Sequence, residues 1–151
     1  MSSKELDNLI KSGLLKSEPA DQTEFNGLLD SGRKRLKDAL KSDLSPESKF
    51  DLAYSATHAF ALAAMRWHGY RPANKRYVVF QALPHTLGIK PEVWRVLDKC
   101  HGLRNSLEYD GSFNVNDQLL ADLLRSATAI KDRVEMLEPI AQAVQAPKRK
   151  R

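Results

Sequence analysis

The fold of this chain is decided by residues 45–69, whose sequence is SPESKFDLAYSATHAFALAAMRWHG. Ser45 can cap a helix that has Pro46 at its first position. The residues that follow are apolar on most sides of this helix, so it must touch several neighbours, and its alanines let them approach closely. The stretch predicts a central helix, ending near Gly69, in an all-α protein.

Two helices are expected before the central one. A short N-terminal helix, opened by Ser2 and Glu5 at capping-box spacing, ends near Gly13. Residues 17–20 indicate a linker, and a second helix follows over residues 21–41. We interpret the basic side chains on the polar face of this second helix as a solvated surface.

The remaining helices follow the central one. Asn74 can cap a helix that ends before Pro84, and Pro91 begins the next helix. The last long helix begins near Asn114 or Asn116. No internal repeat and no convincing strand is found. Long helices joined by short turns predict an antiparallel helical bundle.

The helix that begins at Pro91 carries the most informative polar residue. At 100° per residue its apolar stripe is formed by Val93, Val96, Leu97, Cys100, Leu103 and Leu107. Arg104 lies at the edge of this stripe, beside His101 and Glu108. A guanidinium does not deprotonate and is costly to desolvate without a partner. We therefore interpret Arg104 as the centre of a site; a surface ion pair with Glu108 is the alternative.

Residues 103–111, LRNSLEYDG, resemble the signature of the HEPN superfamily, small helical domains of which many are metal-independent endoribonucleases. The family pattern is an Arg, usually followed by Asn or another polar residue, with a His about four to six residues later. Arg104 and Asn105 match this pattern, and Tyr109 stands where the family has His. By helix order and length, the resemblance covers about residues 45–138 and implies a helical bundle.

The resemblance also implies a reaction, the attack of a ribose 2′-OH on the adjacent phosphate. Arg104 would stabilise the phosphate charge, Asn105 would position the phosphate, and Glu108 would orient Arg104. Tyr109, or alternatively His101, would stand near the 2′-OH or the leaving oxygen. Tyr109 lies about 140° around an ideal helix from Arg104. The resemblance therefore favours a homodimer in which the motifs of two copies face each other.

Three functions stay open at this point. The first, implied by the resemblance, is a toxin–antitoxin or defence-type protein that acts on RNA as a metal-independent endoribonuclease. A cognate antitoxin or a nucleotidyltransferase-type protein would be a further partner. The second is a non-catalytic HEPN relative that binds RNA or protein, and the third is an unrelated helical adaptor.

The charge of the chain is uneven along its length. The net charge is +5, and the last four residues supply four of these charges. We expect residues 147–151 to form a disordered basic tail on a single helical domain over residues 1–146. Residues 45–111 carry nine basic and six acidic side chains, so the segment around Arg104 is positive as well. This distribution is compatible with an RNA partner.

The composition of the chain indicates whether it has a core, a disulfide, a membrane span, a metal or a cofactor. With 151 residues, the chain is long enough to bury a core. Its single cysteine, Cys100, is expected to be a buried structural thiol in a reducing, cytoplasmic setting. No apolar run approaches about 18 residues, so no membrane span is expected. The four histidines lack metal-ligand spacing, and no glycine-rich phosphate loop occurs, so neither a metal nor a cofactor is expected. His58, in the central helix, is interpreted as a satisfied core residue.

Overall fold

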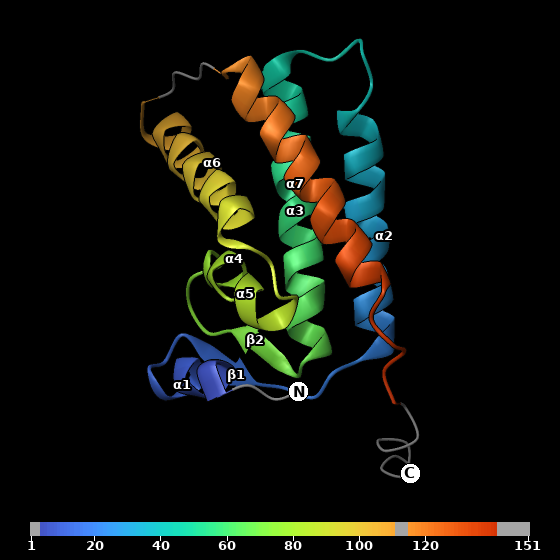
Figure 1. Cartoon of the computed structure of the whole chain (residues 1–151), viewed down its shortest axis with the longest axis vertical. Helices are drawn as coiled ribbons and strands as arrows, with labels where there is room; N and C mark the ends of the chain where they lie inside the picture. Colours follow the sequence, from blue (N-terminus) through green and yellow to red (C-terminus); the bar gives the residue numbers. More distant parts are fainter. Residues whose placement is uncertain (1–3, 111–114, 142–151) are drawn as a thin grey trace.

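The computed structural model describes residues 4–110 and 115–141, with the backbone alone for residues 107–110. Four long helices alternate in direction along the chain (Figure 1). They are α2 (Gln22–Ala39), α3 (Pro46–Trp67), α6 (Pro91–Asp110) and α7 (Asp117–Glu135). The prediction of an all-α antiparallel helical bundle is confirmed.

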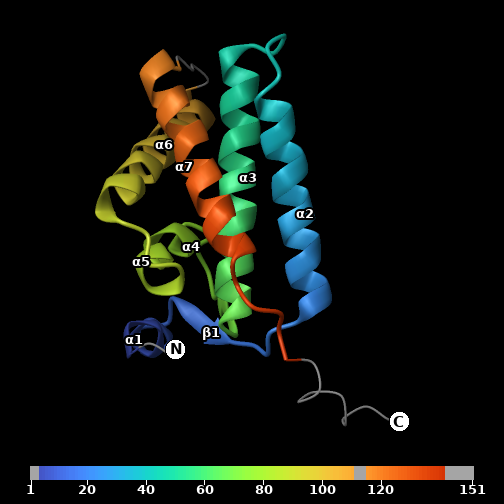
Figure 2. The same ribbon diagram turned by 45° about the vertical axis from the view of Figure 1, so that its right-hand side comes forward.

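Helix α3 is the central helix that the sequence predicts. The hydroxyl oxygen of Ser45 accepts a hydrogen bond from the backbone N–H of Ser48 at 3.1 Å, and Pro46 is the first helical residue. Phe50, Phe60 and most of the alanines of α3 are fully buried. Helices α2 and α6 flank α3, and α7 crosses one of its faces (Figures 1 and 2).

The spacing between α2 and α3 depends on Gly32. A Cβ added at Gly32 would lie 2.5 Å from Cε1 of Phe60, a distance at which the buried ring would have to move. A glycine in the middle of a helix costs about 1 kcal/mol relative to alanine. Glycine is nevertheless favoured at position 32, because only a residue without a side chain lets the two helices pack so closely.

The expectation that the chain contains no strand is wrong. Strands β1 (Leu15–Ser17) and β2 (Tyr70–Pro72) pair antiparallel below the bundle, with Ser17 opposite Tyr70 (Figure 1). Each strand has three residues, too few for the alternation of apolar and polar side chains that predicts a strand. The linker expected at residues 17–20 therefore begins inside a sheet.

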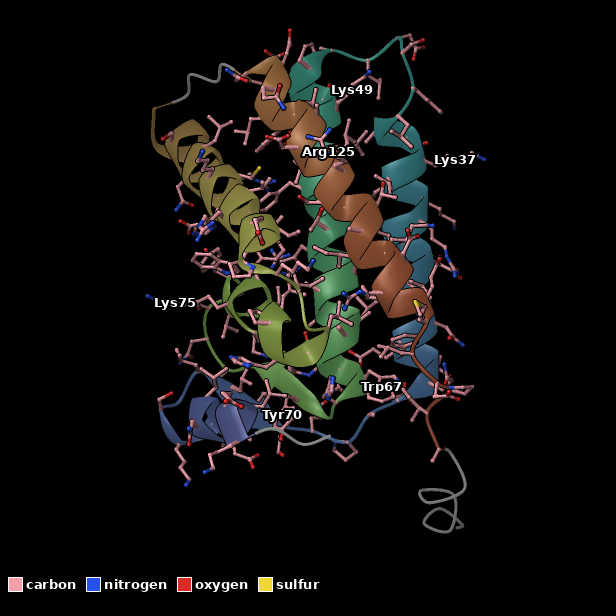
Figure 3. All side chains as sticks on the ribbon, viewed as in Figure 1. Lys37, Lys49, Trp67, Tyr70, Lys75 and Arg125 are labelled. Atoms are coloured by element: carbon pink, nitrogen blue, oxygen red, sulfur yellow. The ribbon has the colours of Figure 1, made fainter. Side chains whose placement is uncertain are left out.

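Helix α1 (Lys4–Lys11) packs against this small sheet. Its Leu6 is fully buried, and the hydroxyl of Tyr70 donates a hydrogen bond to Oδ1 of Asp7 at 2.9 Å. Tyr70 lies at the base of the molecule in Figure 3. Helix α1, β1 and β2 thus form one packed base beneath the long helices.

The helix predicted between Asn74 and Pro84 is two shorter helices. They are α4 (Val78–Gln81) and α5 (Leu83–Thr86), which meet at Ala82. Pro84 lies in the first turn of α5, where its missing N–H is tolerated, instead of following the helix. Asn74 lies in a bend before α4 and caps neither helix.

Helix α7 is capped by Asn116, one of the two starts that the sequence left open, and the side-chain oxygen of Asn116 accepts hydrogen bonds from two backbone N–H groups. Its expected core stripe is buried from Leu120 to Val134. Beyond α7, the indole N–H of Trp67 donates to the carbonyl of Glu138 at 2.7 Å. The predicted basic tail at 147–151 lies outside the described residues. Among the described helices, none has the length and apolar character that a membrane crossing requires.

Candidate functional site

A pocket of about 430 Å³ opens beside α3, and none of its lining residues comes from α7. Its walls come from α2, α3, α6 and the turn that leads into α4. Its polar lining residues are Ser31, Arg35, Tyr54, Ser55, His58, Arg76, Tyr77, His101, Arg104 and Asn105. The three arginines are cationic groups suited to binding an anion.

The structure brings together three of the residues selected from the sequence. His101, Arg104 and Asn105 all line the pocket from α6, about one helical turn apart. The other two, Glu108 and Tyr109, lie in the last turn of α6, but their side chains are outside the described part of the structure.

Arg104 reaches toward α3. Its Nη1 lies 3.5 Å from Oδ1 of Asp51, and its Cζ lies 5.1 Å from the centroid of the Tyr54 ring, a cation–π contact. The side chain is 32% exposed. The sequence left open an ion pair between Arg104 and Glu108; the described ion pair is with Asp51. Among the described residues, this one long ion pair leaves most of the guanidinium donors of Arg104 available to a ligand.

His101 is held on both of its ring nitrogens. Its Nδ1 lies 3.2 Å from the hydroxyl of Tyr54, and its Nε2 lies 3.3 Å from the amide nitrogen of Asn105. An Asn105 amide that donates to Nε2 leaves the proton on Nδ1, which then donates to the Tyr54 oxygen. The ring also stacks on Tyr77, with centroids 4.0 Å apart and planes at 26°. These contacts hold the ring of His101 in place.

An aromatic group supports the pocket from below. The ring of Phe80, fully buried in α4, makes edge-to-face contacts with Tyr54, Tyr77 and His58. The hydroxyl of Tyr77 donates to Oδ1 of Asp98 at 2.5 Å. Burial and the Asp98 carboxylate raise the pKa of Tyr77 above its usual value. Tyr77 therefore keeps its proton at neutral pH and adds no negative charge to the pocket.

His58 is not the satisfied core residue that the sequence analysis expects. It lies in the wall of the pocket, with Nδ1 3.4 Å from Nη2 of Arg76, and its buried Nε2 has no hydrogen-bond partner among the described residues. Burial, followed by the positive charges of Arg76 and Arg104, lowers the pKa of His58 to about 4. His58 is therefore neutral at pH 7, and both arginines lie close enough to affect it.

Sequence reasoning missed several lining residues from other elements. Tyr54 and His58 are four residues apart on a helix that is otherwise apolar, and this spacing was the available signal. Arg35 was counted among the solvated cations of α2. Nothing in the sequence near Arg76 or Tyr77 indicates that the turn before α4 reaches α6.

The charges of the pocket are unbalanced. Among the described residues, no carboxylate lines it, and the ion pair with Asp51 is its only salt bridge. Arg35 donates to the side chain and carbonyl of Ser31, and Arg76 contacts His58, so neither has a described carboxylate partner. The pocket therefore offers cationic donors to an anionic ligand.

Two further features of the described residues bear on chemistry. Cys100 is fully buried, as expected, and burial raises the pKa of its thiol to about 12, which makes it a poor nucleophile. No group of three or more His, Cys, Asp or Glu side chains that could hold a metal ion occurs in the described part of the chain.

Comparisons with protein-family models, with curated proteins and with solved structures give no match to this chain. The resemblance to the HEPN superfamily therefore rests on Arg104, Asn105 and the order of the helices.

Proposed function

We propose that this protein binds RNA, with a phosphate of the strand held in the pocket by Arg104. The observation that carries the proposal is one pocket lined by Arg35, Arg76 and Arg104, with no carboxylate among its described lining residues. Guanidinium groups present planar pairs of donors that suit phosphate oxygens. The resemblance to HEPN domains adds the expectation that the phosphate belongs to RNA, in a toxin–antitoxin or defence setting.

The aromatic side chains extend this proposal from phosphate to nucleic acid. Tyr77 and His101 form a stacked pair beside Arg104 in the pocket lining, and bases of single-stranded RNA stack on such rings. A bare phosphate site would need no such surface. Single-stranded RNA is the ligand that uses both the arginines and the rings.

Metal-independent cleavage is a second candidate function, favoured by His101 in the same pocket as Arg104. In this reaction the 2′-oxygen forms a bond to phosphorus as the bond from phosphorus to the 5′-oxygen breaks. A base takes the proton of the 2′-OH, and the 5′-oxygen gains a proton, which leaves a 2′,3′-cyclic phosphate and a 5′-OH. His101 would serve as the base once Asn105 releases its Nε2, and Arg104 would stabilise the charge on phosphorus.

The test compares the full chain with Arg104→Gln and with a matched control, Arg125→Gln. Arg125 lies on α7, away from the pocket lining, is 69% exposed and pairs with Asp122 (Figure 3). Binding of a fluorescent single-stranded RNA is measured in a chelator at fixed salt. Arg104→Gln should weaken binding about tenfold to a hundredfold, as loss of a charged hydrogen-bonding group does. Arg125→Gln should change it by less than about threefold.

The same samples also test cleavage. Cleavage by the natural chain that falls about a hundredfold or more in Arg104→Gln, with 2′,3′-cyclic ends on the product, supports the second candidate. Binding that depends on Arg104 without any cleavage limits the function to RNA binding. Equal binding by Arg104→Gln and Arg125→Gln contradicts the assignment of the pocket.

A further inference from the structure

We propose that the pocket takes a single nucleotide that carries a phosphate monoester, at the end of an RNA strand. This rests on the proposed RNA binding and adds which part of the strand enters. An internal phosphate is a diester with one negative charge, whereas a terminal monoester carries about −1.5 to −2 at pH 7. The two differ in charge and in whether the strand continues past the phosphate.

The charge of the pocket matches a monoester. Three guanidinium groups, those of Arg35, Arg76 and Arg104, line it, and Asp51 pairs with one of them at 3.5 Å. Two positive charges therefore lack a described carboxylate. His58 between Arg76 and Arg104 stays neutral at pH 7 and adds no charge of its own. A single diester charge would leave a cation unbalanced, whereas a dianionic phosphate balances both.

The size and the apolar part of the pocket match one nucleotide. A volume of about 430 Å³ is near the lower end of the range for small-ligand sites. Leu28 of α2 and Leu62 of α3 line it as well, together with Ala59. The two helices are antiparallel, and Leu28 lies seven residues before Arg35, about 10 Å along α2. A base can therefore rest on the leucines while its phosphate reaches the arginines, with the ribose between them.

The test uses one short single-stranded RNA sequence made with three kinds of ends. One RNA has a 5′-phosphate, one has a 3′-phosphate, and one has hydroxyls at both ends. Each is titrated with the full chain, with Arg104→Gln, with Arg35→Gln and with Arg125→Gln, and thermal melting verifies that each variant is folded. AMP, adenosine and inorganic phosphate are then added as competitors.

We expect one of the phosphate-ended RNAs to bind about tenfold or more tightly than the hydroxyl-ended RNA. Arg104→Gln and Arg35→Gln should remove most of this difference, and Arg125→Gln should retain it. AMP should compete at a concentration at least about tenfold lower than adenosine or inorganic phosphate, because only AMP supplies both the base and the phosphate.

The possible failures are distinguishable. If all three RNAs bind equally and binding still depends on Arg104, the terminal phosphate is excluded and the proposed RNA binding stands. If no RNA binds but AMP binds directly and depends on Arg104, the ligand is a free mononucleotide and the RNA function is wrong. If neither RNA nor AMP binds, both proposals fail.

Discussion

The base of the bundle and the pocket both contain arginines, but the arginines of the two regions differ in how completely they are paired. At the base, Arg66 is 1% exposed and donates to a carboxylate oxygen of Glu24 and to three backbone carbonyls, at 2.7–3.1 Å. Arg71 adds ion pairs to Glu18 and Glu24. In the pocket, Arg104 has one ion pair to a described side chain, with Asp51 at 3.5 Å.

This difference separates a structural arginine from one suited to a ligand. Arg66 uses four of the five donors of its guanidinium within its own chain, and its charge is balanced where it is buried. At the base, two arginines lie beside two carboxylates. At the pocket, three arginines lie beside one described carboxylate. An arginine in a pocket that lacks part of its hydrogen-bond partners can use its remaining donors to bind an anion.

Replacing Arg66 should lower the free energy of unfolding more than any of the other substitutions described below. Arg66→Ala leaves Glu24 partly buried with fewer donors and leaves three carbonyls without their partner. Breaking a buried pair by removing one member costs about 3–5 kcal/mol. We expect the free energy of unfolding, measured by urea denaturation at pH 7, to fall by about this amount.

The control is Arg125→Ala, which removes an arginine that is 69% exposed and should cost less than about 1 kcal/mol. Arg104→Ala should resemble this control in stability, because its contacts are few and partly solvated. A loss as large for Arg104→Ala as for Arg66→Ala would erase the distinction between the two regions.

The sequence predicts the long helices well because their signals are local. Ser45 with Pro46, and Asn116 before α7, place two helix starts from capping chemistry alone. The base was missed because its strands have three residues each and its bonds join residues about 50 positions apart, as between Glu18 and Arg71. No local pattern encodes such a pairing.

The candidate site was predicted only in the part that one helix supplies. His101, Arg104 and Asn105 are neighbours on α6, so their spacing is visible in the sequence. Arg35 and Arg76 reach the same pocket from α2 and from the turn before α4, through packing that the sequence does not display. The homodimer expected from the family resemblance stays a prediction.

A smaller effect is expected at Gly32, which sets the distance between α2 and α3. Helix α2 carries Glu24 to the base and Arg35 to the pocket, so this contact connects the two regions. In Gly32→Ala, overpacking against Phe60 costs about 1–3 kcal/mol, and better helix propensity returns up to about 1 kcal/mol. We expect a net loss of about 1–2 kcal/mol in urea denaturation.

Gly27→Ala is the matched control, because the same helix has open space around Gly27. That variant should be more stable than the natural chain by about 0.5–1 kcal/mol. Similar gains in both variants would mean that α2 can shift away from α3 without loss. RNA binding by Gly32→Ala then reports whether the position of Arg35 depends on this packing.

The smallest expected effect is on how the free energy of unfolding changes with acidic pH, which differs between the base and the pocket. Hydrogen bonds from Arg71 lower the pKa of Glu18, so its contribution is present above its unfolded pKa of about 4.5 and is lost as the pH falls further. The pKa of His58 is also lowered, from 6.5 to about 4, but His58 is charged below its pKa. Between pH 6.5 and pH 4, this histidine is protonated in the unfolded chain but neutral in the folded chain. The free energy of unfolding therefore falls as the pH drops from 6.5 toward 4.

His58→Gln should therefore flatten the dependence of stability on pH in this upper window alone. We expect the natural chain to lose about 1 kcal/mol more than the variant between pH 6 and pH 5, measured by urea denaturation. His85→Gln, at an exposed histidine, should keep the slope of the natural chain. An unchanged slope in His58→Gln would mean that His58 takes up its proton in the folded pocket, where a third cation beside Arg76 and Arg104 would then strengthen anion binding.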